Sequence, residues 1–170
     1  MSETAPREPQ PAPVRLRAFK ALRMPRGTAI PAMNNIAKVA MAHLRVPCAV
    51  VTLFEEDLPY VVGRYGADGS RIDGTEDMSR HVIDSDDVVA FDDLETHDRY
   101  RPFAPKVDGQ PVRFFAAAPM VVPMGVRIGT VCIFDYAPRI MNLGQRIILR
   151  QLAAIASDEL KTMAGCPATA

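Results

Sequence analysis

Hydrophobic side chains recur with a helical period in three parts of the chain. Residues 30–45 and 141–163 place apolar positions three and four apart, which predicts two amphipathic helices, the second being the longest of the chain. Residues 14–24 alternate basic and apolar side chains and predict a short basic helix. That helix could dock to a partner or form a dimer, or it could pack on its own domain, and the sequence favours the packed arrangement.

Two pairs of apolar runs rich in β-branched residues predict antiparallel hairpins. Cys48–Phe54 and Pro59–Tyr65 are joined by a short polar turn. Val112–Val122 and Arg127–Phe134 flank a turn that contains Gly125. The second pair is the clearest strand signal in the sequence.

The segment between the hairpins, residues 66–111, is rich in Gly, Asp and Ser and is expected to be mostly loop. We expect a short helix near Asp77–Ile83, a short strand at Val88–Phe91, and a cap at Asp92-Asp93 for the helix that follows. This order predicts an α+β domain with a central antiparallel sheet. The two long helices would cover one face, and the segment would fold over the other.

Composition separates the expected domain from its ends. Residues 1–13 contain four prolines among small polar residues and predict a disordered or extended tail. We therefore expect a disordered tail over 1–13, an N-terminal helix and linker over 14–29, one domain over 30–164, and a disordered C-terminus over 165–170.

Charge is balanced, with 20 Lys and Arg against 20 Asp and Glu among 170 residues. A neutral chain argues against a partner such as nucleic acid or an anionic membrane, which would require a cationic face. No apolar run approaches the ~18 residues of a membrane helix, and the N-terminus lacks the apolar core of a signal peptide. We therefore expect a cytoplasmic protein.

The three cysteines, Cys48, Cys132 and Cys166, are too few and too scattered for a disulfide framework or a zinc site. Cys48 and Cys132 lie in apolar runs and are expected to be buried. Free buried thiols suit a reducing compartment.

Residues 112–139 carry a more specific pattern. It combines an aromatic strand with a small-small-Pro-apolar ending, a Gly-containing turn, a Gly-Thr strand closing on Asp, and Pro-Arg before a final helix. The matching positions are Phe114-Phe115-Ala116, Pro119-Met120, Gly125, Gly129-Thr130, Asp135 and Pro138-Arg139. This run resembles the GAF domain family, and weaker likeness extends over roughly residues 30–163.

The resemblance implies a GAF-like antiparallel sheet of about six strands, with N- and C-terminal helices on one face. Loops and short helices would form a pocket on the other face. Members of the family sense small molecules such as cyclic nucleotides, bilins, haem or anions, or act through dimers. The segment that carries a bilin-anchoring Cys in many relatives reads Met78–Val82 here, so a thioether-linked bilin has no anchor. No cyclic-nucleotide pattern is found either.

The expected ligand-binding residues are drawn from the pocket-forming segment and the strand after it. They are His81, Asp92, Asp93, Arg99, Tyr100, Arg113, Phe115 and Ala117. Arginines suit an anion, because a guanidinium binds carboxylate or phosphate in a bidentate way. Asp92 and Asp93 could hold Arg99 or Arg101 in place. Alternation places Arg113 and Phe115 on one strand face and Phe114 on the other, without saying which face lines the pocket.

His81 or His97 could ligate haem iron. A lone His without a second ligand is more often a hydrogen-bonding residue. The acidic stretch 84–93 lacks the spacing of a calcium loop, and we predict no metal site. We also predict no catalytic residues. A free-methionine-sulfoxide reductase on this fold would need paired thiols, which the three cysteines do not offer.

Two functions stay open. In the first, the chain is a stand-alone sensory domain that binds a small, possibly anionic ligand and signals through its terminal helices. In the second, it binds no ligand and is a dimerisation or docking module for a separate histidine kinase or cyclase. A small-molecule ligand, a homodimer and a signalling-protein partner are the expected partners. A reductase-like enzyme is the least favoured alternative.

Overall fold

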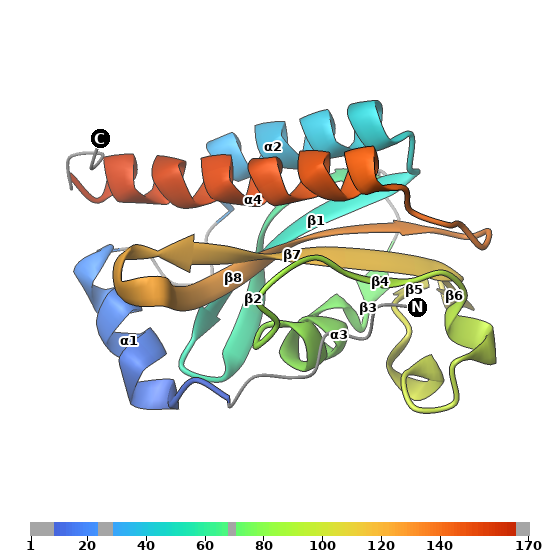
Figure 1. Ribbon diagram of the computed structural model, residues 1–170, viewed down its shortest axis with the longest axis horizontal. Helices are drawn as coiled ribbons and strands as arrows, with labels where there is room; N and C mark the ends of the chain where they lie inside the picture. The colour runs from blue at the N-terminus through green and yellow to red at the C-terminus, as the bar shows by residue number, and fades with distance from the viewer. Residues whose placement is uncertain (1–8, 24–28, 68–70, 166–170) are drawn as a thin grey trace.

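The computed structural model describes residues 9–23, 29–67 and 71–165. Its centre is a five-stranded antiparallel sheet in the order β2-β1-β8-β7-β4 (Figure 1). The strands are β1 (Cys48–Glu55), β2 (Leu58–Gly66), β4 (Val89–Phe91), β7 (Phe114–Val122) and β8 (Val126–Asp135). Both predicted hairpins and the α+β antiparallel architecture are therefore confirmed.

The predicted sheet of about six strands differs from the structure in one respect. Residues of the 66–111 segment form a separate small sheet, in the order β3-β5-β6. Its strands are β3 (Ile72–Asp73), β5 (Lys106–Val107) and β6 (Gln110–Pro111). Strands this short have no apolar alternation for sequence analysis to detect, because they lie within a polar loop.

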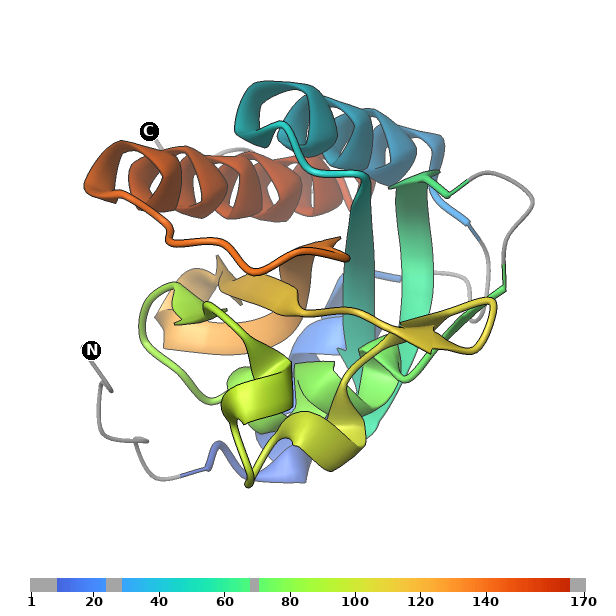
Figure 2. The ribbon, with the colours of Figure 1, turned by 90° about the vertical axis from the view of Figure 1, so that its right-hand side faces the viewer.

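Two long helices cover one face of the sheet and lie side by side (Figures 1 and 2). They are α2 (Pro31–Leu44) and α4 (Leu143–Met163), close to their predicted bounds. Small side chains such as Ala37 and Ala153 are buried and let the helices approach the strands. At the start of α4, Asn142 accepts a hydrogen bond from the Gln145 backbone N–H, and the Gln145 side chain accepts one from the Asn142 N–H.

The basic N-terminal helix, α1 (Ala12–Ala21), packs on its own domain, against β1 and β8 at one end of the sheet (Figure 1). Phe19 and Leu22 are buried there. The helix begins at Ala12, inside the stretch that we expected to be a disordered tail. Pro13 fits this position because the first helical turn has no intrahelical use for its missing N–H. The rest of the expected tail, residues 1–8, and residues 166–170 lie outside the described residues.

The opposite face of the sheet is covered by the 66–111 segment, as predicted. Its helical parts are α3 (Thr75–Val82), η1 (Leu94–Thr96) and η2 (Arg101–Phe103). Beneath them lies a second apolar core, separate from the core under α2 and α4. Figure 2 shows this layer on the far side of the sheet from the two long helices.

The structure also shows which face of β7 each side chain occupies, which strand alternation alone left open. Phe114 and Ala116 belong to the core under α2 and α4, whereas Phe115 and Ala117 belong to the core under α3. Within the described part of the chain, no helix is both long enough and apolar enough to cross a membrane.

Candidate functional site

The predicted ligand-binding residues fall into three separate places on the α3 side of the sheet. His81, Arg99 and Tyr100 meet at the surface of the α3–η2 layer. Asp93 and Arg113 form an ion pair at the edge of the same layer. Phe115 and Ala117 lie in the core below, exposed by 0% and 1%.

An aromatic cluster joins the end of α3 to the segment that contains η2. The His81 ring centre lies 4.2 Å from that of Phe103 and 5.6 Å from that of Tyr100. Tyr100 in turn lies 4.7 Å from Phe91 and 5.1 Å from His97, again between ring centres. These contacts hold the outer layer to the strand β4.

Burial and a neighbouring charge favour the neutral form of His81 in this cluster. The guanidinium of Arg99 stands 5.1 Å from the Tyr100 ring centre. Partial burial lowers the pKa of His81, and the nearby Arg99 lowers it further. The core below is filled by buried side chains, and haem ligation by His81 or His97 stays a prediction.

Arg113 is bound by carboxylates of its own chain. Its Nε and Nη2 donate to the two Asp93 carboxylate oxygens at 2.6 and 2.5 Å, and its Nη1 lies 2.8 Å from a Glu95 oxygen. The hydrogen bond from Arg113 lowers the pKa of Asp93. Asp93 also caps η1, where it accepts from the Glu95 N–H. The expected cap is therefore present, but Asp93 holds Arg113 where we expected Arg99 or Arg101.

Asp92 contributes a hydrogen bond through its backbone carbonyl. Its carbonyl accepts a hydrogen bond of 3.0 Å from the Arg139 N–H, and its side chain is exposed. The Arg113 donors are thus directed to Asp93 and Glu95, and ligand binding by Arg113 and Asp92 stays a prediction.

A cluster of polar side chains lies deep between α3 and the sheet, and sequence reasoning missed it. The Thr52 and Thr130 hydroxyl oxygens are 2.7 Å apart, and each lies within hydrogen-bond distance, 3.2 Å, of the Ser79 hydroxyl oxygen. The Cys132 sulfur lies 3.1 Å from the Thr130 hydroxyl. All four residues are 0% exposed. The signal was available, because Thr52 and Thr130 are polar residues in the interior of two apolar strands, and the two positions pair in register.

Thr52, Ser79, Thr130 and Cys132 are called the buried hydroxyl cluster below. Two further observations concern its cysteine and the start of α3. Burial raises the pKa of the Cys132 thiol to about 11, which keeps it protonated and unreactive. The Thr75 hydroxyl, at the start of α3, is also buried, and none of the described residues gives it a hydrogen-bond partner. A buried hydroxyl without a partner is unusual in a folded core.

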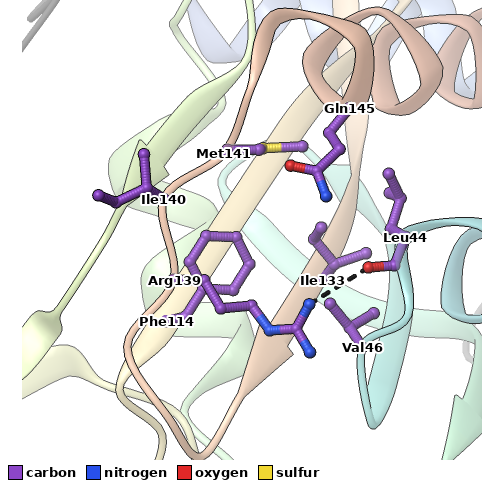
Figure 3. A pocket seen from close by; sticks show the side chains of 8 residues that line it. All are labelled: Leu44, Val46, Phe114, Ile133, Arg139, Ile140, Met141 and Gln145. Atoms are coloured by element: carbon purple, nitrogen blue, oxygen red, sulfur yellow. Dashed lines mark hydrogen bonds between the residues drawn. The ribbon is translucent and has the colours of Figure 1, made fainter.

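A cavity of about 150 Å³ lies on the opposite face of the sheet (Figure 3). It opens where the end of α2, the strand β8 and the loop into α4 meet. Its lining residues are Leu44, Val46, Phe114, Ile133, Arg139, Ile140, Met141 and Gln145. None of the predicted ligand-binding residues lines it, because sequence reasoning placed the pocket on the α3 side.

Comparison with known proteins identifies the fold. No protein-family profile matches the chain. The GAF domain of an Acinetobacter phosphoenolpyruvate-protein phosphotransferase superposes with a TM-score of 0.64 at 13% identity, covering 92% of this chain and 95% of that one. The Thermosynechococcus elongatus PixJ GAF domain gives 0.58 at 17% identity, covering 88% of each chain.

Two further similar proteins extend the comparison. The chromophore-binding domain of a bacteriophytochrome from R. palustris gives a TM-score of 0.60 at 10% identity, covering 91% of this chain and 61% of that one. In sequence, the chain is 25% identical over 107 residues, 62% of its length, to a cyclic di-GMP phosphodiesterase of Pseudomonas aeruginosa. It spans 18% of that enzyme's length. The structural likenesses show that the chain has the GAF-domain fold, as the sequence resemblance implied.

Proposed function

Because the chain has the GAF-domain fold, we propose that it is a sensory signalling domain whose ligand binds between the sheet and α3. The terminal helices would pass the resulting change to a partner. Support comes from similar structures that include a chromophore-binding domain and photoreceptor GAF domains. What those proteins bind is a property of their own chains, and the present ligand is argued from the residues below.

The observation that carries this proposal is the buried hydroxyl cluster. Placing hydroxyls in a core costs free energy unless each is hydrogen-bonded, and apolar residues of similar size would fill the space at lower cost. Thr52, Ser79 and Thr130 satisfy one another, but the Thr75 hydroxyl has no partner among the described residues. A small ligand with polar groups, held under α3, would give the Thr75 hydroxyl its partner.

Ligand entry requires the α3 layer to move, because Met78, Phe115 and Leu94 fill the space between α3 and the sheet. The aromatic contacts of His81 with Tyr100 and Phe103 close the layer at the surface. Rings at an exposed edge can separate without breaking a strand, so this edge is the proposed opening. The ligand would then contact the predicted residues His81 and Tyr100 on its way to Thr130.

The test is a search for ligand-induced stabilisation. Native mass spectrometry and an absorbance spectrum of protein from its own host would identify a bound molecule, and a thermal melt would measure its stabilising effect. Thr130→Val should remove that effect, whereas Thr162→Val should leave it intact because Thr162 lies exposed on α4. A ligand that stabilises native protein and Thr130→Val equally would refute this site.

A second function is favoured by a different observation, on the outer side of α4. Leu143, Ile147, Ile155 and Met163 are exposed by 70, 44, 54 and 50%. Such a run is typical of a helix that pairs with a second copy or with a signalling protein. Light scattering on Ile155→Glu tests the dimer, with Gln110→Glu as the control that adds the same charge at an exposed position of β6, outside α4. The Ile155 variant should shift the protein toward monomer and the control should not.

The proposal assigns no reaction to this domain. A thiol-exchange reductase needs accessible thiolates, and Cys48 and Cys132 are both 0% exposed. Free thiols also support a location in a reducing compartment such as the cytoplasm.

A further inference from the structure

We propose that the cavity between α2, β8 and α4 is a second ligand site, which takes a small monocarboxylate with an apolar body. This site lies on the face of the sheet opposite to the proposed sensory pocket. It shares no residue with the buried hydroxyl cluster or the aromatic cluster.

The size and the walls of the cavity define the body of the ligand. Leu44, Val46, Phe114, Ile133 and Met141 form apolar walls, and each is less than a tenth exposed. An engineered apolar cavity of similar volume, about 150 Å³, stays dry and binds benzene. The present cavity of about 150 Å³ therefore suits a body of about six non-hydrogen atoms.

Two polar side chains define the head of the ligand. Arg139 donates from Nε to Asp135 at 2.5 Å, from Nη1 to the Leu44 carbonyl at 3.3 Å, and from Nη2 to the Arg45 carbonyl at 2.5 Å. A guanidinium has five N–H groups, so donors remain after these bonds. Its side chain is 33% exposed, which leaves it accessible at the mouth of the cavity.

The amide of Gln145 faces the cavity from the opposite wall (Figure 3). Its oxygen accepts from the Asn142 N–H, and within the described part of the chain the amide nitrogen remains available as a donor. Both polar groups therefore offer hydrogens, so the complementary head accepts hydrogen bonds. Asp135 already balances the Arg139 charge, so the head is selected by its acceptor oxygens. A carboxylate has two such oxygens, and an ammonium group has donors only.

The position of the cavity gives such a ligand an effect on the outer helices. Arg139 ties the loop before α4 to the end of α2 through the two backbone carbonyls. Ile140 lines the cavity and is 85% exposed, so a bound apolar body would also cover part of it. Binding would therefore order the loop that leads into α4.

The experiment is an NMR titration of the full chain with sodium hexanoate, and with hexylamine hydrochloride at equal ionic strength as the charge-reversed probe. Millimolar concentrations are appropriate for so small a ligand. Hexanoate should shift the amide signals of Ile133, Ile140 and Met141 saturably, and hexylamine should not. No saturable shift at these amides, or equal shifts from both probes, would overturn the proposal.

Gln145→Glu is the informative variant because it should fold. A glutamate still accepts from the Asn142 N–H and so keeps the cap of α4, but it replaces the free donor with a negative charge. We expect hexanoate binding to weaken about tenfold or more, the effect of losing a charge-assisted contact. Gln151→Glu adds the same charge on an exposed turn of α4 and should leave binding unchanged. Native-like binding by Gln145→Glu would refute the assigned head site.

Discussion

Arg15 fixes α1 to the end of the sheet, and its removal tests how that helix is held. The side chain is 2% exposed. Its Nε donates to the Arg127 carbonyl and its Nη1 to the Glu56 carbonyl, both at 3.1 Å. Its Nη1 also lies 2.9 Å from an Asp57 oxygen, and its Nη2 lies 3.2 Å from an Asp84 oxygen. One residue of α1 thus bonds to three separate parts of the chain.

The loss in the free energy of unfolding depends on which partners of Arg15 water can reach after Arg15→Ala. Asp57 is 74% exposed, so its ion pair contributes little. Asp84 is 25% exposed, and a hydrogen bond to such a charged group contributes ~1.5–3 kcal/mol. The two carbonyls would lose their donor in a buried place, and the Phe54 ring would lose the guanidinium 5.5 Å from its centre. Against this stands the relief of a buried charge, so the net loss is about 2–4 kcal/mol.

Urea denaturation followed by circular dichroism measures this loss, and a thermal melt gives a second reading. A chain of this size loses ~2–4 °C in Tm for each kcal/mol, so the expected fall is roughly 5–15 °C. Arg15→Met keeps the apolar stem and isolates the guanidinium. Arg17→Ala is the control, because Arg17 lies exposed on the same helix. A loss below about 1 kcal/mol for Arg15→Ala, or an equal loss for Arg17→Ala, would refute the reasoning.

Three further outcomes are expected. Gly129→Ala should cost about 3 kcal/mol or more by urea denaturation, because its Cβ would overlap the Thr52 carbonyl oxygen of the neighbouring strand. Burial raises the pKa of Cys132 to about 11, so iodoacetamide should label it in mildly alkaline buffer only after unfolding, as read by peptide mass spectrometry. The pKa of Asp93 is lowered, so any stability from its pair with Arg113 is present above the unfolded-state pKa and is lost as pH falls through the folded-state pKa. NMR should accordingly find Asp93 titrating at higher pH in Arg113→Gln.

The sequence determined the elements of this fold because their signals are local. Helical spacing at 30–45 and 141–163, and β-branched runs around two short turns, depend only on neighbouring residues. The observed α2, α4 and both hairpins follow these predictions within a few residues. The run at 112–139 added the fold, since its pattern of Gly, Pro and Asp resembles that of the GAF domain family.

The candidate site was predicted only in part. The order of elements along the chain placed His81 and Tyr100 in the segment that covers the sheet. Their ring centres lie 5.6 Å apart there. Alternation put Phe115 and Ala117 on one face, but the period of a strand carries no information about which layer covers that face. The hydroxyl contact of Thr52 with Thr130 joins residues 78 positions apart, and it required the register of β1 on β8.

The tertiary structure alone decided the partners of the charged groups and the location of the cavity. The sequence predicted that Arg113 binds a ligand, and the fold brings the carboxylates of Asp93 and Glu95 to its guanidinium. The cavity exists because the Arg139 loop meets the end of α2 near Leu44, 95 positions earlier in the chain. Each segment determines its own hydrophobic periodicity. Ion pairs and cavities form only where segments that are distant in the sequence meet. The sequence therefore determined the layers of this protein, and packing determined its sites.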